Sequence, residues 1–338
     1  MRKSTKGLLL WVTLCIISAI IFMSLFGAYN NSIEGKKKII INNLKSIEGK
    51  QTLTGHWTTY QPPWYKTFMS QVLQIQNTTG KYPFIIAGDY RNINNTVDYS
   101  FTNSLFINHT KKGGYAMLVV DWINPNTTDN ARNRSVSIRE VLTSGTKSNT
   151  NFLIQLNAVA KGLQELQDNK VIVLFDTFHE MNADYFWWGK RTPQDYKDLY
   201  IYTHNFMYKK GIHNLLYMYT PDTKINWSGS WYNPNVTDYY PGNEYVDIVA
   251  LDYYGVNINN IQNYYDAMLT LNKPFGFAEF GHASWNNPIN YSALITLNAI
   301  KEKYPKTTFI MSYLDVWSMA NQQNIYQFFN DPRMVNLK

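Results

Sequence analysis

Short apolar runs recur along this chain, and each is followed by a polar loop and then, in several cases, by a helical pattern. Most of the runs are continuous rather than alternating, which is typical of parallel strands covered on both faces. The eight runs are residues 52–57, 83–89, 115–121, 171–180, 214–220, 246–252, 274–280 and 307–313.

Helical patterns separate many of these runs. Leu153, Leu156, Val159, Leu163 and Leu166 follow one helical stripe. A second helix is predicted to start with Thr192 as its N-cap and Pro193 at its first position. Three further helices are predicted over residues 65–76, 260–271 and 291–304.

Eight strands alternating with helices over about 290 residues predict an α/β fold, a single (β/α)8 TIM barrel. We place this domain at residues 39–338. The alternative is an open, doubly wound sheet, which usually carries a glycine-rich phosphate turn after its first strand. Residues 55–64, GHWTTYQPPW, are not such a turn, so the barrel is favoured.

Composition excludes several other classes of protein. The chain has 338 residues, of which 45% are hydrophobic and 16% aromatic, and this is far more apolar than a disordered protein. Cys15 is its one cysteine, which excludes a disulfide-stapled miniprotein and a zinc ribbon.

The first 38 residues form a separate segment. Residues 8–26 are apolar apart from Thr13, Ser18 and Ser24, and they follow a basic stretch, so they predict a signal peptide or a signal anchor. No clean cleavage site decides between the two. In either case we expect a secreted or membrane-anchored protein whose folded domain is extracellular or lumenal. Nine Asn-x-Ser/Thr sequons would make it a glycoprotein in a eukaryotic host.

The net charge of +7 lies mainly in this leader. Residues 1–38 contribute +5 and the remaining 300 contribute +2. A nucleic-acid-binding domain concentrates basic residues on its folded part, so no nucleic-acid partner is expected, and membrane contact is expected only through the N-terminal segment. We expect a monomer.

Two glutamates stand where function gathers in a barrel, at the carboxyl ends of strands. Glu180 ends the fourth apolar run, and Glu279 lies near the end of the seventh. Opposed carboxylates can act as nucleophile and general acid/base on a glycosidic bond, although each could instead pair with a basic residue.

A metal site is not expected. His179 and Glu180 would begin a zinc-protease motif, but no second histidine follows at the required spacing. The other five histidines form no ligand pattern, and the chain has no Gly-x-Ser-x-Gly elbow for a serine nucleophile. We therefore expect no cofactor.

Aromatic residues crowd the same strand ends. Tyr185 and Trp188 follow Glu180, Trp122 follows the third run and Tyr254 the sixth. Core packing would account for about half of such residues. The others suit stacking against sugar rings, whose faces are apolar.

Residues 178–189, FHEMNADYFWWG, closely resemble the acid/base signature of glycoside hydrolase family 26, the β-mannanase family of (β/α)8 glycosidases. Three further blocks are similar to the fifth, sixth and seventh strands of that family, in the right order. They are HNLLYMYTPD (213–222), YYPGNEYVDIVALDYYG (239–255) and KPFGFAEFG (273–281).

This resemblance implies a role for each candidate residue. Glu180 would be the acid/base and Glu279 the nucleophile. His179 would contact the nucleophile or its sugar, and Tyr254 would hydrogen-bond Glu279. The residues that would line the innermost sugar subsites are Asp252, Tyr185, Trp188 and Trp317.

Three departures from the family pattern affect substrate preference. Asp176-Thr177 replaces the usual Arg-Pro, Ala183 replaces a glycine, and Trp122-Ile123 replaces a Trp-His pair that contacts the distal mannose. We expect Trp122 to remain able to stack.

We predict a retaining endo-β-glycanase that cuts β-1,4-mannan-type polysaccharide. The alternatives are β-1,3-xylanase or mixed-linkage β-glucanase activity on the same barrel, or a catalytically weak carbohydrate-binding or coat protein. Loss of either glutamate would have favoured this last alternative, and both are present.

Overall fold

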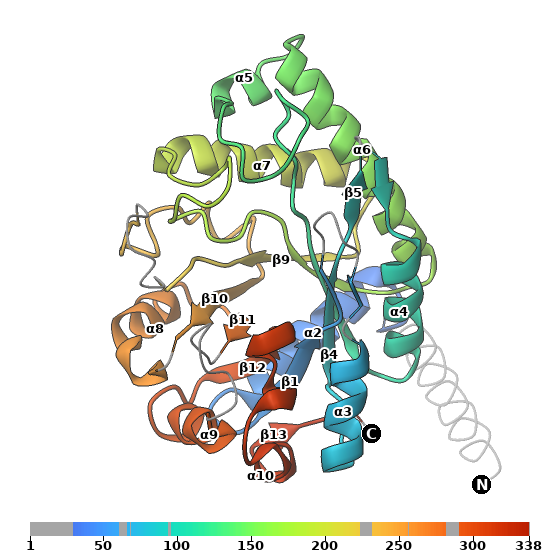
Figure 1. The fold of residues 1–338 in the computed structure, drawn as a ribbon. Helices are drawn as coiled ribbons and strands as arrows, with labels where there is room; N and C mark the ends of the chain where they lie inside the picture. Colours follow the sequence, from blue (N-terminus) through green and yellow to red (C-terminus); the bar gives the residue numbers. More distant parts are fainter. Residues whose placement is uncertain are drawn as a thin grey trace, which may run out of the picture.

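The computed structural model describes residues 30–60, 66–67, 69–93, 96–223, 232–255, 257–281 and 291–337. Its centre is a closed barrel of eight parallel strands, in which each strand pairs with the next and the last, β12, pairs with the first, β1 (Figure 1). The strands are β1 (Thr52–Trp57), β4 (Ile85–Asp89), β7 (Tyr115–Val119), β8 (Val173–Asp176), β9 (Leu215–Tyr219), β10 (Ile248–Tyr254), β11 (Phe275–Gly281) and β12 (Thr307–Ser312). The (β/α)8 prediction is confirmed.

Helices surround the strands (Figure 1). They are α2 (Ile33–Ile47), α3 (Met69–Thr79), α4 (Ser100–Lys111), α5 (Ile138–Leu142), α6 (Lys147–Asp168), α7 (Pro193–Lys209), α8 (Gln262–Leu269), α9 (Ala293–Glu302) and α10 (Ile325–Asn330). Short elements complete the described fold: β2 (Thr59–Tyr60), β3 (Lys66–Thr67), β5 (Arg91–Ile93), β6 (Thr96–Asp98), β13 (Met334–Val335), and the 3₁₀ turns η1 (Ile258–Asn260), η2 (Asp315–Trp317) and η3 (Met319–Asn321).

The five predicted helices are present. The Thr192 side chain caps α7 by accepting a hydrogen bond from the Asp195 amide, and Pro193 is the first helical residue. The leucine stripe lies on α6, which is longer than the stripe itself. Helix α4 was not predicted because its buried face includes Thr102, Asn103 and His109, which hide the apolar periodicity.

Two hydrophobic layers hold the barrel together. One lies between the strands and the outer helices. The other fills the barrel interior, where residues such as Leu53, Met117 and Phe309 pack. Gly276 makes room for this packing, because a Cβ at that position would overlap the Phe309 ring.

Helix α2 closes the amino-terminal end of the barrel. Its Ile40, Leu44 and Ile47 join the interior layer. The domain boundary expected between residues 38 and 39 falls inside this helix, so the described fold includes residues before it. The apolar stretch 8–26 lies outside the described residues. None of the helices described is long and apolar enough to cross a membrane.

The end of the chain returns to its beginning. Strand β13 pairs in parallel with β1, with Met334 opposite Thr52. The Arg333 guanidinium donates to the Gly49 carbonyl at 2.8 Å, and the Leu337 amide donates to the Tyr82 carbonyl at 2.9 Å. Strand β1 therefore pairs with late parts of the sequence on both edges, with β12 on one and β13 on the other. Arg333 also holds the loop before this strand.

Candidate active site

Glu279 is fixed within β11, where it pairs in register with Asp252 of β10. Its side chain is 7% exposed. The Tyr254 hydroxyl donates a short hydrogen bond to its Oε2, the contact that the sequence resemblance implied. A strand on each side and this hydrogen bond hold the carboxylate rigidly.

Glu180 is placed differently from the expectation that it ends a strand. Strand β8 stops at Asp176, and Glu180 lies in the turn beyond it with a left-handed φ of 53°. This conformation is disfavoured for residues with a side chain. Its amide donates to the Thr220 carbonyl at 2.8 Å, so the turn is held in place by the end of β9.

The two glutamates face each other closely. One carboxylate oxygen from each of Glu180, Asp252 and Glu279 lies within 4.8 Å of the others. A retaining pair of carboxyl groups lies about 5–5.5 Å apart, whereas an inverting pair lies about 6.5–9.5 Å apart to admit a water molecule. The arrangement therefore fits a nucleophile and its acid/base partner.

Burial sets the protonation of this pair. It raises the pKa of Glu180 well above its usual range, and the charges of Asp222 and Glu279 add to this effect. Burial also raises the pKa of Glu279, but the hydrogen bond from Tyr254 opposes it. A carboxylate that accepts a hydrogen bond favours its ionised form. The resulting pKa of Glu279 is about 8, so Glu279 ionises more readily than Glu180, whose carboxyl group no described side chain stabilises in its charged form in this way.

A network that sequence analysis missed joins the Glu180 turn to the loop after β9. Asn182 accepts a hydrogen bond from the Asp222 amide at 2.9 Å and donates to the Asp222 carbonyl at 2.9 Å. The Asp222 side chain is fully buried and accepts from Tyr185 at 3.2 Å. Asp222 ends the TPD segment of one of the similar blocks, which was its only sequence signal.

Asp252 is fully buried beside the pair. Neither of its carboxylate oxygens has a hydrogen-bond partner within the described part of the chain. Burial and the charges of Glu279 and Glu180 raise its pKa well above the usual range. Its proximity to both glutamates agrees with a place in the innermost sugar subsite, which stays a prediction.

His179 lies next to Glu180 and is neutral. Burial lowers the pKa of its imidazole to about 3. Its ring packs edge-on against Phe186, with centroids 4.7 Å apart. Its Nδ1 is buried and makes no hydrogen bond to the residues described. A contact of His179 with the nucleophile or its sugar stays a prediction.

The predicted aromatic residues divide into two groups. Tyr185 and Trp317 are half-buried, and Trp317 contacts the Tyr254 ring edge-on with centroids 5.6 Å apart. Trp122 and Trp188 have no exposed surface. The expectation that these two line the sugar subsites is corrected here, because both belong to the hydrophobic layer outside the strands.

Each buried indole also uses its N–H within the protein. Trp122 Nε1 donates to the Thr177 carbonyl at 2.7 Å, and Trp188 Nε1 donates to the His179 carbonyl at 2.8 Å. Their role is to support the Glu180 turn from behind.

The glycosyl hydrolase family 26 model matches residues 30–338. The chain belongs to this family. A mannan endo-1,4-β-mannosidase of Bacillus subtilis (strain 168) is 31% identical over 330 residues, which cover 91% of this chain and 87% of that protein. Mannan endo-1,4-β-mannosidase A and B of Caldalkalibacillus mannanilyticus is 32% identical over 320 residues, covering 87% of this chain. The match spans only 58% of that longer relative.

Solved structures agree with the sequence comparison. A Bacillus subtilis mannanase superposes with a TM-score of 0.79 at 29% identity, covering 91% of this chain and 94% of the other. The resemblance inferred from the motifs is confirmed.

The departures from the family 26 pattern do not affect Glu180 or Glu279 themselves but lie at neighbouring positions. Asp176, in place of an arginine, is 1% exposed at the end of β8. Burial raises its pKa to about 7, with a further contribution from the charge of Asp121. Ile123 is 7% exposed, so it packs rather than presenting a side chain to a distal sugar. Ala183 is fully buried.

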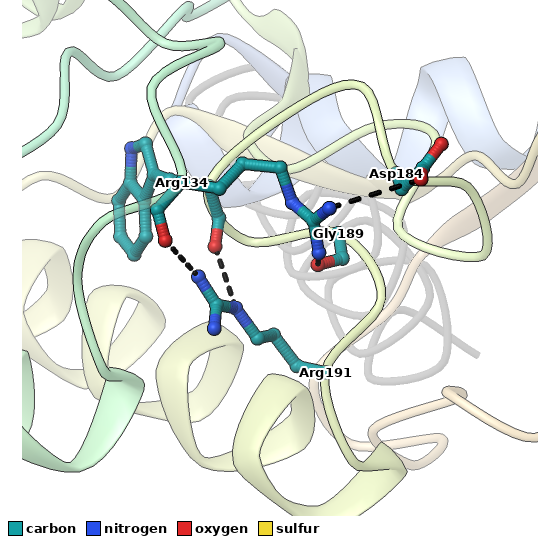
Figure 2. Close-up of polar contacts among 5 residues, drawn as sticks. Arg134, Asp184, Gly189 and Arg191 are labelled. Atoms are coloured by element: carbon teal, nitrogen blue, oxygen red, sulfur yellow. Dashed lines mark hydrogen bonds and ion pairs between the residues drawn. The ribbon is translucent and has the colours of Figure 1, made fainter. Parts of the chain in front are cut away.

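Two arginines clamp the aromatic loop of this family 26 site (Figure 2). Arg191 donates to the Trp187 carbonyl at 2.7 Å and to the Arg134 carbonyl at 3.1 Å. Arg134 donates to the Gly189 carbonyl at 3.3 Å, and its ion pair with Asp184 is 3.8 Å long. The clamp joins the loop after β7 to the loop that carries the indoles behind Glu180.

Proposed function

We propose that this family 26 chain is a retaining endo-β-1,4-mannanase. The observation that carries the proposal is the close approach of the Glu180 and Glu279 carboxylates, the first held in the turn after β8 and the second within β11. The relatives named as mannan endo-1,4-β-mannosidases support the choice of mannan as substrate.

The reaction follows from the protonation of the pair. Glu279 attacks the anomeric carbon while protonated Glu180 donates its proton to the leaving oxygen, which breaks the glycosidic bond. Glu180, now ionised, then takes a proton from water, and the water oxygen displaces Glu279 from the sugar. Both steps invert the anomeric carbon, so the product keeps the β configuration.

Neighbouring groups are assigned to positioning and binding. Tyr254 holds Glu279 in its attacking orientation. We place His179, Tyr185, Asp252 and Trp317 against the sugars nearest the scissile bond. No step in this reaction needs a cofactor.

Release of reducing ends from a panel of polysaccharides tests the substrate. We expect cleavage of mannan and galactomannan, and little cleavage of β-1,3-xylan or lichenan. Preferential cleavage of β-1,3-xylan or lichenan would replace the mannan assignment. No cleavage of any of them would favour the carbohydrate-binding alternative.

Two variants test the mechanism. Glu279→Ala should abolish turnover of every substrate. Glu180→Ala should retain turnover of aryl glycosides, whose leaving groups need little protonation, and azide should rescue it with a β-glycosyl azide product. Equal loss in both variants on aryl glycosides would mean that the roles are assigned wrongly.

We also propose that the protein acts outside the cytoplasm, either secreted or held by its N-terminal segment, as a monomer. The apolar stretch 8–26 behind a basic start supports this location. Cell fractionation with and without membrane extraction distinguishes the secreted form from the anchored form. Glycosylation of the nine sequons applies only in a eukaryotic host, where enzymatic deglycosylation would shift the mass.

A further inference from the structure

Positive charge gathers at the amino-terminal end of the barrel, opposite the active site. This face consists of α2 with its following loop and the turns that lead from helices into strands. Its segments are residues 33–51, 80–84, 111–114, 168–172, 209–214, 242–247, 270–274 and 302–306. They carry 14 lysines and six carboxylates. The rest of the chain from residue 30 has 14 basic and 18 acidic residues. The lysine face is thus strongly basic on a domain that is otherwise acidic.

Helix α2 unites these segments into one surface. Asn43 donates to the Tyr115 hydroxyl at 2.8 Å, at the start of β7. The Lys36 ammonium donates to the Lys170 carbonyl at 3.2 Å, before β8. Glu48 pairs with Lys306, before β12, at 3.3 Å. The helix therefore lies across the strand starts (Figure 1), with its buried isoleucine and leucine side turned to the barrel interior.

Two exposed apolar side chains lie on this face or directly beside it. Ile39 of α2 is 47% exposed, and Tyr208, beside Lys209 and Lys210 at the end of α7, is 65% exposed. The lysines alone would be enough to bind a soluble polyanion. An aliphatic side chain and a tyrosine among lysines are what a lipid interface accommodates, since aromatic rings and apolar groups settle at the headgroup level.

An apolar stretch of the kind that enters membranes lies shortly before α2 in the sequence. Only residues 27–32 separate the apolar stretch 8–26 from the first residue of α2. Even fully extended, this connection spans no more than roughly 25 Å. An apolar stretch that enters a bilayer would therefore hold the start of α2 within about 25 Å of the headgroups. Such a short tether lets the face approach to within about 8–10 Å, the distance over which the surface charge acts at physiological salt.

From these observations we propose that the lysine face docks on an anionic lipid surface, with Ile39 and Tyr208 entering the headgroup layer. A lipid-inserted segment together with a basic patch provides the two signals that stable membrane binding requires. Docking in this way directs the mouth of the barrel, with Glu180 and Glu279, away from the membrane. The proposal does not depend on the substrate assigned above.

Lysine acylation on the full-length chain tests the docking. The protein is reconstituted into vesicles of phosphatidylcholine alone or with one third phosphatidylglycerol, and labelling of each lysine by a water-soluble reagent is followed by mass spectrometry. Lys45, Lys112 and Lys210 on the face should be labelled at least about fivefold more slowly in the anionic vesicles, the factor that one lysine contributes at such a surface. Lys147 and Lys161 of α6 should be labelled equally in both.

The dependence of lysine labelling on salt provides a second test. At 1 M salt the screening length falls to about 3 Å, so the protection of the three lysines should disappear. Protection that is equal in both kinds of vesicle, or that survives high salt, would overturn the proposal. Soluble polyphosphate is the competing partner, and protection by it stronger than that by anionic vesicles would also overturn it.

A pair of matched variants assigns the effect to this face. Lys45→Glu/Lys112→Glu/Lys210→Glu should abolish the protection of the remaining face lysines. The control reverses three charges elsewhere, Arg139→Glu/Lys147→Glu/Lys161→Glu, and should keep it. Equal loss in both variants would show that net charge alone is responsible and would contradict a specific face. Near-UV circular dichroism of both variants confirms that they are folded.

Discussion

Tyr185 donates its hydroxyl hydrogen to the Asp222 carboxylate at 3.2 Å, and Asp222 is the neighbouring charge that acts most strongly on Glu180. Burial is the main cause of the raised pKa of Glu180, and the phenol positions the charge that adds most to it. Asp222 is itself fixed through its backbone by Asn182, two residues beyond Glu180. Acid, charged neighbour and phenol form one connected unit.

Asp222→Asn should lower the pKa of Glu180, because the negative charge that disfavours its ionisation is removed. A lower pKa of the acid moves the basic limb of the kcat/KM profile to lower pH. A pH profile on mannan measures this shift. The control is Asp184→Asn, which removes a carboxylate that pairs with Arg134 on the loop that carries Glu180. It should leave the basic limb in place. A fall in kcat/KM with both limbs unmoved would show that Asp222 acts only on folding.

Asp176→Asn should move the opposite limb. The charge of Asp176 raises the pKa of Glu279, so its removal lets the nucleophile ionise at lower pH. The acidic limb of kcat/KM should shift to lower pH, and the basic limb should follow less. An unchanged acidic limb would mean that Asp176 stays protonated throughout the working range.

The same variant should change how stability depends on pH. Burial raises the pKa of Asp176 in the folded chain from its ordinary value of 3.8 to about 7, so between about pH 4 and 7 the unfolded chain releases a proton that the folded chain retains. The free energy of unfolding contributed by this group therefore falls as pH rises through that window. Asp176→Asn should be more stable than the parent at pH 8 and similar to it at pH 4, as measured by urea unfolding.

Arg191→Met should loosen the loop that carries the buried indoles. It removes two hydrogen bonds from a charged donor to carbonyl groups, each of which contributes about 1.5–3 kcal/mol. We expect a loss of at least about 2 kcal/mol in the free energy of unfolding, with kcat reduced more than KM is raised, because the loop supports Glu180. Lys161→Met, an exposed cation on α6, should change neither quantity. Identical effects of the two substitutions would refute the clamp.

Trp122→Phe should act on stability and leave substrate preference alone. The indole is buried, and its N–H bond to Thr177 is lost in the variant, at a cost of about 1–3 kcal/mol for the unpaired carbonyl. The length of manno-oligosaccharide needed for efficient cleavage should stay the same. Trp317→Phe, at a half-buried ring next to Tyr254, should raise KM instead. A change of length preference in Trp122→Phe would return this residue to the sugar subsites.

The strands were predictable because a barrel strand is buried on both faces and therefore reads as a continuous apolar run. Each of the eight runs overlaps a barrel strand. Helices α2 and α4 were harder to predict. The first has three consecutive lysines followed by three consecutive isoleucines, and the second buries asparagine, threonine and histidine.

Within the site, the two glutamates were predictable from their position after apolar runs and from the motif. The exposure of the tryptophans was not predictable, since a tryptophan close to a strand end in sequence can point either into the cleft or into the hydrophobic layer outside the strands. Trp122 and Trp188 point to the outer layer, whereas Trp317 faces Tyr254. Asp222 was missed because its effect on Glu180 arises from a contact between the turn after β8 and the turn after β9. These turns are far apart in sequence, so no local sequence pattern predicts the contact.

The pairing of β1 with both β12 and β13 has a kinetic consequence. Leu53 pairs with Phe309 of β12, some 256 residues later, so a chain emerging from the ribosome cannot close its barrel until β12 has been synthesised. Contacts of such long sequence separation slow folding. The barrel therefore stays open during most of its synthesis, and a nascent chain stalled before residue 307 should remain sensitive to protease over its first strand.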